Sequence, residues 1–197
     1  MSVEAAAPTR PMRADARRNY EAIVRVASEA FAEHGTQTSL DDIASRAGVG
    51  PGTLYRHFPN RDCLLEASLV DSRHQLLALG ERLLDADDAD DALDEWMFAL
   101  ARHAGTWDGL ADSIAQSLNN EKSPLGASCG AVITATRKLL ERATALGSVT
   151  ADASARELFI MAGSLAWAAD RAARGEGNGT GEDELPRLLA LLMRGLR

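Results

Sequence analysis

Aromatic residues, proline and long apolar runs are all scarce in this sequence, and each scarcity narrows the class of protein. Only 5% of the 197 residues are aromatic and six are proline, whereas alanine, leucine and charged residues are abundant, which favours helices over sheets. No uncharged apolar stretch reaches about 18 residues, and residues 1–15 lack the apolar run of a signal peptide. We therefore expect an all-α protein that is soluble, cytoplasmic and not bound to a membrane.

Cysteine is also scarce, which bears on metal binding and catalysis. Cys63 and Cys129 lie far apart, in no CxxC pattern and no Cys/His cluster, so we expect reduced, buried thiols, no metal site and no cofactor. His74, His103 and Cys129 could in principle act as a base or a nucleophile. However, the sequence has no catalytic triad spacing, nucleophile elbow or phosphate-binding loop, and these absences argue against an enzyme.

The net charge of −8 argues against a nucleic-acid partner until it is divided along the chain. Residues 1–63 hold eight arginines against eight acidic residues, so the excess acid lies beyond them. Four of these arginines cluster near the N-terminus around a single acid, Asp15: Arg10, Arg13, Arg17 and Arg18. We interpret residues 1–17 as a flexible basic arm suited to a phosphate backbone or a minor groove, with a solvated tail as the alternative.

Apolar spacing and helix-end signals predict about nine helices. The expected ranges are 18–34, 40–47, 51–57, 61–84, 92–104, 108–118, 124–145, 154–173 and 184–195. Gly35 ends the first helix, Ser39 caps the second, and Pro51 begins the third, where its missing N–H does no harm. A short turn at 48–50 joins the second and third helices, which predicts a helix-turn-helix that places the third helix in a DNA major groove.

Five short motifs follow one another at tight spacing between residues 18 and 65. They are FAEHG at 31–35, TSLDDIA at 38–44, AGV at 47–49, GTLYRHF at 52–58 and NRDCLL at 60–65. Together they closely resemble the N-terminal domain of the TetR (tetracycline-repressor-like) family of transcriptional regulators. With this resemblance, the expected organisation is the basic arm at 1–17, a helix-turn-helix DNA-binding domain at 18–60, and an effector-binding and dimerisation domain at 61–197.

Five of the predicted DNA contacts position the protein on the phosphate backbone. The resemblance implies that Tyr55 and His57 bind phosphates flanking the groove and that Arg61 clamps the backbone. Ser39 and the backbone N–H groups at the start of the second helix can hold a phosphate, with help from Thr38. Contacts of this kind fix the register of a protein on DNA but do not read its sequence.

The edge that would read the bases departs from the commonest pattern of the family. Gly50 stands where serine is frequent, and Pro51 stands where lysine or another polar residue is frequent. Because Pro51 and Gly52 carry no side-chain hydrogen-bonding group, base reading falls on contact of Pro51 with a thymine methyl, on Thr53 or Tyr55, and on Arg56 where it reaches guanine. The sequence therefore predicts DNA binding but not the operator.

The resemblance also implies that residues 61–197 hold a small-molecule pocket. Aromatic and polarisable residues of the middle helices are the candidates, and they suit a largely apolar ligand, with plain core as the alternative for many of them. The predicted ligand-binding residues are Trp96, His103, Trp107, Ile114, Cys129, Ile133 and Trp167.

Dimerisation and regulation follow from the same resemblance. The last two long helices have apolar faces that need a partner, so we expect a homodimer with recognition helices about 34–36 Å apart on a palindromic operator. We expect a repressor in which ligand binding tilts the fourth helix and separates the two heads. The alternative keeps the fold but makes the body a protein-docking surface or a thiol-redox sensor, with Cys63 as the switch.

Overall fold

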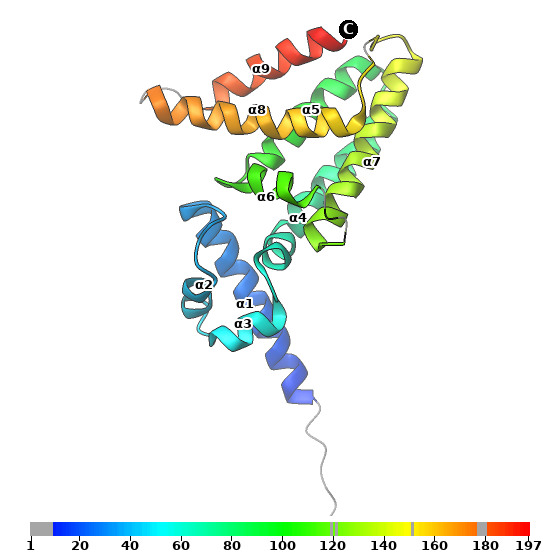
Figure 1. The fold of residues 1–197 in the computed structure, drawn as a ribbon. Helices are drawn as coiled ribbons and strands as arrows, with labels where there is room; N and C mark the ends of the chain where they lie inside the picture. The colour runs from blue at the N-terminus through cyan, green and yellow to red at the C-terminus, as the bar shows by residue number, and fades with distance from the viewer. Residues whose placement is uncertain (1–9, 119, 121, 151, 177–180) are drawn as a thin grey trace, which may run out of the picture.

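The computed structural model describes residues 10–118, 120, 122–150, 152–176 and 181–197. This part of the chain contains nine helices and no strand, as predicted (Figure 1). The helices are α1 (Arg10–His34), α2 (Leu40–Arg46), α3 (Pro51–His57), α4 (Arg61–Leu84), α5 (Ala89–Ala104), α6 (Leu110–Ser117), α7 (Pro124–Ala145), α8 (Ala155–Glu176) and α9 (Gly181–Leu196). None of these helices is long and apolar enough to cross a membrane.

The first helix begins at Arg10, well before the expected start at residue 18. Arg17 pairs with Glu21 one turn later at 2.7 Å, and Arg18 pairs with Asp15 on the preceding turn. Pairs at this spacing stabilise a helix, so the arginines expected in an arm instead extend α1. Residues 10–17 of the predicted arm are therefore helical, and residues 1–9 lie outside the described residues.

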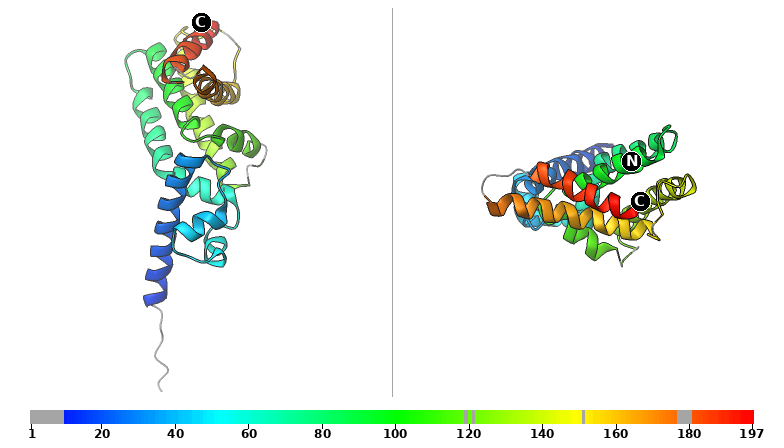
Figure 2. Two further views of the ribbon diagram at one scale, coloured as in Figure 1. Left: turned by 90° about the vertical axis from the view of Figure 1, so that its left-hand side faces the viewer. Right: turned by 90° about the horizontal axis from the view of Figure 1, so that it is seen from above.

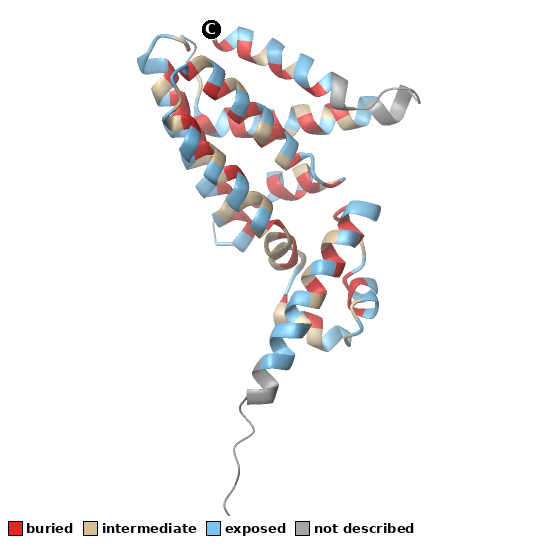
Figure 3. Ribbon diagram, turned by 180° about the vertical axis from the view of Figure 1, so that it is seen from behind, coloured by how far each residue is buried: buried red, intermediate tan, exposed pale blue. Residues whose placement is uncertain are grey.

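Helices α1, α2 and α3 form the head, which has a small core of its own. The core is made of side chains that are at most 2% exposed: Ile23, Ala27, Phe31, Ile43, Leu54 and Phe58. Ser39 caps α2 by accepting a hydrogen bond from the N–H of Asp42 at 3.4 Å, as expected. Figure 3 shows buried residues of α1 facing the two shorter helices.

Helices α4 to α9 form the body. Helix α4 leaves the head and packs against α5 and α7, while α8 and α9 run side by side across the far end (Figures 1 and 2). Trp96 of α5 occupies the centre: it is fully buried, and its Nε1 donates to Thr136 Oγ1 of α7 at 3.0 Å. A Cβ atom at Gly80 of α4 would lie 2.8 Å from the Trp96 ring, so a glycine there allows the two helices to approach closely.

Head and body meet where the α1–α2 loop contacts the α5–α6 loop. The N–H of Thr36 donates to the Asp108 carbonyl at 2.8 Å, and the rings of Phe31 and Trp107 lie 5.3 Å apart. Arg61 Nη1, at the start of α4, donates to the carbonyls of Thr36 and Thr38 at 2.5 and 2.6 Å. We call these contacts between residues 31–38, Arg61 and residues 107–109 the head–body joint.

Candidate DNA interface and body cavity

One face of helix α3 is exposed to solvent. Pro51, Gly52, Tyr55 and Arg56 are exposed, whereas Leu54 is fully buried against the head core. Gly50 provides no side-chain cap, and its carbonyl accepts from the N–H groups of the first turn. The predicted base-reading residues therefore lie on the outer surface of α3, with Thr53 half-buried at its edge.

His57 at the end of α3 is held by two aromatic neighbours. Its ring lies edge-on to Tyr20 of α1 at 6.1 Å and 6.2 Å from Phe58. Tyr20 itself is 40% exposed beside His57. Tyr20 is thus a candidate for positioning His57. The sequence analysis missed it, because the only indication in the sequence was a tyrosine among the apolar positions of this helix.

Two of the predicted phosphate contacts also have partners inside the protein. The Thr38 hydroxyl donates to the Gly35 carbonyl at 2.8 Å, and Arg61 Nη1 donates within the head–body joint. Ser39 remains exposed at the start of α2. Sequence reasoning assigned these three residues to DNA, and it did not predict that Thr38 and Arg61 also hold the α1–α2 loop.

Arg56 of α3 is available to bind an external anion, whereas two other arginines of the head are held in ion pairs. Arg25 and Arg46 are bound to Glu29 and Glu33 at 2.8 and 2.9 Å, which reduces their attraction for an external anion. Arg56 is exposed and forms no ion pair with any described residue. A free guanidinium on the exposed face of α3 suits phosphate or guanine, because both offer acceptor atoms that it can bridge.

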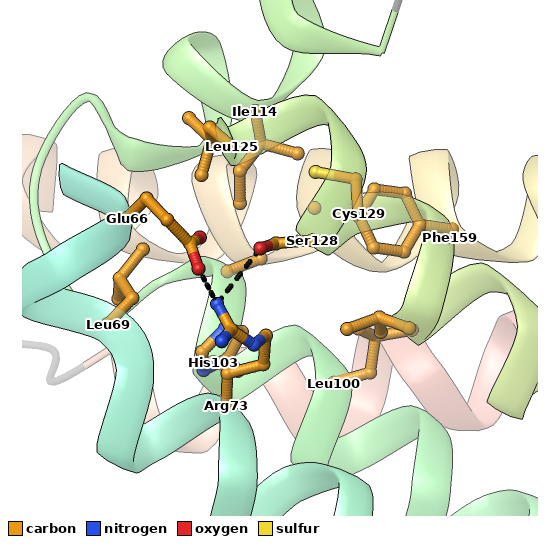
Figure 4. A pocket seen from close by; sticks show the side chains of 13 residues that line it. Glu66, Leu69, Arg73, Leu100, His103, Ile114, Leu125, Ser128, Cys129 and Phe159 are labelled. Atoms are coloured by element: carbon orange, nitrogen blue, oxygen red, sulfur yellow. Dashed lines mark hydrogen bonds and ion pairs between the residues drawn. The ribbon is translucent and has the colours of Figure 1, made fainter. Parts of the chain in front are cut away.

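The body contains a narrow cavity lined by α4, α5, α6, α7 and α8 (Figure 4). Most of its walls are apolar, including Leu69, Leu100, Ile114, Leu125, Val132 and Phe159. The volume of the cavity is only about 30 Å³, enough for about one or two waters. A ligand larger than water must therefore move the walls apart.

The cavity also holds a compact polar cluster. Glu66 and Arg73 of α4 form an ion pair with each side chain 15% exposed, and Arg73 Nη1 donates to Ser128 Oγ of α7 at 2.9 Å. Burial, and secondarily the charge of Arg73, lowers the pKa of His103 to about 4. Burial, and secondarily the charge of Glu66, raises the pKa of the Cys129 thiol to about 11. Both groups are therefore neutral near pH 7, and Cys129 is a poor nucleophile.

The seven predicted ligand-binding residues divide between the cavity and other places. His103, Ile114 and Cys129 lie together in its lining. The other four lie elsewhere: Trp96 in the body core, Trp107 in the head–body joint, Ile133 packed against the core, and Trp167 exposed on α8.

Sequence reasoning missed the polar cluster of Glu66, Arg73 and Ser128. Glu66 and Arg73 lie about two helical turns apart on α4, on the same side as Leu69. That pattern was a usable signal, because two opposite charges inside an apolar helix face must find partners within the fold. The position of Ser128 on α7 was not accessible in this way.

The fold and the surface of α3 define a helix-turn-helix DNA-binding protein with a cavity-containing body. Residues 23–68 match the model described as bacterial regulatory proteins, tetR family, and residues 88–197 match the model described as the SbtR-like transcriptional regulator C-terminal domain. The second match alone covers more than half of the chain. The chain therefore belongs to the TetR family of DNA-binding transcriptional regulators.

Solved structures and curated relatives agree with this assignment. A TetR transcriptional regulator from Streptomyces coelicolor is 29% identical, with 90% of this chain and 98% of that chain covered and a TM-score of 0.57. A TetR regulatory protein from Mycobacterium vanbaalenii is 30% identical, with 95% and 99% covered and a TM-score of 0.50. An HTH-type transcriptional regulator from Staphylococcus aureus is 43% identical over 54 residues, which span 27% of this chain and 29% of that relative.

Proposed function

We propose that this regulator is a repressor that binds a palindromic operator as a homodimer and leaves it when a small, largely apolar ligand enters the body cavity. One observation carries the proposal. Helix α4 begins at Arg61 in the head–body joint, and about one to three turns later the same helix supplies Glu66, Leu69 and Arg73 to the cavity wall. A ligand in the cavity therefore touches the helix that is attached to the head.

The homodimer is supported by apolar residues left exposed on α8 and α9. Ile160, Met161 and Trp167 of α8 and Leu191 of α9 are each between 41% and 56% exposed. A second copy of the chain would cover them, and a two-fold axis would place two α3 helices about 34–36 Å apart, one turn of DNA. The family resemblance points to the same two helices as the dimer interface.

Release of DNA requires the ligand to prefer one arrangement of the heads. Because the cavity is small, a larger ligand must displace its walls, such as α4 or α6, and a tilt of α4 would separate the two heads. To weaken operator binding tenfold, the ligand must favour the non-binding arrangement by about 1.4 kcal/mol. Crystal structures with and without ligand that showed the same head separation would contradict this mechanism.

The test starts from DNA selected by the purified protein from random sequence, followed by footprinting at several salt concentrations. We expect a palindrome occupied by two chains, and binding without sequence preference would overturn the proposal. The pair Tyr55→Phe and His57→Ala should weaken binding about equally across sequences, because both residues are assigned to phosphates. His74→Ala is the matched control, since His74 is an exposed histidine of α4 outside the head.

A further inference from the structure

We propose that the body cavity selects a neutral amphipathic molecule whose hydroxyl or amide N–H donates to Glu66 Oε2, and that it discriminates against carboxylates. This inference rests on the proposed function, because it names the class of ligand for the same cavity. It concerns the head group of the ligand, whereas the apolar walls bind the remainder.

The unused hydrogen-bonding capacity of the cavity belongs to Glu66. One carboxylate oxygen, Oε1, pairs with Arg73 Nη1, which also donates to Ser128. The other oxygen, Oε2, is buried and has no hydrogen-bond partner among the described residues. Figure 4 shows the Glu66 carboxylate reaching from α4 into the space bounded by Ile114 and Leu125. A carboxylate oxygen can only accept, so the ligand must bring a donor.

The charges of the cavity favour a neutral ligand. Glu66 and Arg73 cancel each other, and His103 and the Cys129 thiol are neutral near pH 7 because of their pKa values. A ligand carboxylate would add a second anion beside Glu66, which already neutralises the charge of Arg73. A ligand ammonium would add a second cation beside Arg73. Both would bury an additional charge without a counter-charge of its own, which is costly.

The shape of the surroundings indicates an elongated ligand. In the single chain a groove of about 560 Å³ runs between α6 and α8, and it shares Ile114, Phe159 and Gly163 with the cavity. The lining of the groove also includes Ile160 and Trp167, which the proposed second copy of the chain would cover. These three residues separate the groove from the polar cluster. A molecule that passes between them would place its head at Glu66 and its apolar chain between Ile114 and Phe159.

The inference can be tested by calorimetric titration of the full-length protein with octanol, octanoate and octylamine, three probes that share one chain and differ in the head group. We expect octanol to bind at least about tenfold more tightly than the two charged probes. Octanoate binding as tightly as octanol would overturn the inference, and so would the absence of binding by all three probes.

Substitutions of the polar cluster separate a head-group contact from a structural role. Glu66→Leu should weaken octanol binding about tenfold and allow octanoate to bind more tightly than octanol, because Arg73 is then unpaired. Where that variant fails to fold, the double variant Glu66→Leu with Arg73→Met removes both charges. It should weaken octanol about tenfold without gaining affinity for octanoate. Glu81→Gln, an exposed acid on α4, is the control and should leave all affinities unchanged.

Operator binding in the presence of each probe distinguishes this inference from the proposed function. If octanol binds in a Glu66-dependent way but the operator stays bound, the selectivity stands and ligand-induced release is refuted. If octanoate binds and releases the operator while octanol does not bind, release stands and the selectivity is refuted. An octanol affinity unchanged in the double variant would also refute the assignment of Glu66 Oε2.

Discussion

Gly109 in the head–body joint offers a substitution whose effect can be divided into two parts. Its φ is +76°, and a Cβ atom there would lie 2.6 Å from Thr36 Oγ1, which belongs to a fully buried residue. Gly147, in the loop after α7, has a φ of +80° and no atom within 4 Å of the same position. Alanine at either site meets the same backbone strain, but only Gly109→Ala disturbs the joint.

The expected loss of stability follows from these two contributions. A left-handed backbone conformation costs an alanine about 1–2 kcal/mol, so Gly147→Ala should lower the free energy of unfolding by about that amount. Forcing the new methyl group against Thr36 adds about 1–3 kcal/mol at Gly109. Because the contact fixes the loop between α1 and α2, operator affinity should also fall in Gly109→Ala and remain unchanged in Gly147→Ala.

Urea denaturation of the two variants measures the first effect, and titration of the operator measures the second. Both variants must be compared at the same protein concentration, because a dimer is more stable at higher concentration. An equal loss of stability in the two variants would show that the close approach of Gly109 to Thr36 does not constrain the joint. An operator affinity that falls equally in both would refute the link between joint and head.

Two further predictions concern the cavity and the start of α4. Because the pKa of His103 is lowered to about 4, the unfolded chain binds a proton below about pH 6.5 that the folded chain does not accept. The free energy of unfolding should therefore fall by up to about 3 kcal/mol as the pH drops from about 6.5 to 4. His103→Gln should remove this loss in urea denaturation at a series of pH values, and equal pH slopes would contradict the prediction. Arg61→Met should cost about 2 kcal/mol of stability through the lost hydrogen bonds and reduce the salt dependence of operator binding by about 0.9 in log–log slope. An unchanged slope would leave Arg61 with a role in the joint alone.

The head was predictable because its helix ends are marked by local signals. Ser39 caps α2, Pro51 begins α3, and Asn60 caps α4 through a 3.0 Å hydrogen bond from the N–H of Cys63. Each signal acts within three residues, so one sequence is sufficient to place it. The early start of α1 was missed because the basic cluster was interpreted as an anion-binding arm or a solvated tail, and not as one side of helical ion pairs.

The body cavity was less predictable because its composition depends on which large side chain fills which space. Trp96 was a reasonable wall residue from its chemistry, but Thr136 on α7 satisfies its indole N–H and places the ring in the core. Trp107 packs against Phe31 in the head–body joint and not in the cavity wall. Contacts between residues so distant in sequence leave no local pattern, so chemistry alone could not separate the cavity wall from the core.

Two helices, α4 and α6, connect the walls of the cavity to the head–body joint. The proposed release of DNA therefore does not need a large movement. Arg61 and Arg73 lie on one continuous helix, about 18 Å apart along its axis, so a tilt caused at Arg73 is carried to the joint at Arg61. Ile114 lies on α6, which begins directly after the joint residue Gly109. A ligand that separates α4 from α6 therefore pulls on both sides of the same joint. Thr36 contacts Asp108, just before α6, and Arg61, at the start of α4. A ligand that separates these two helices should therefore first change the contacts of the joint.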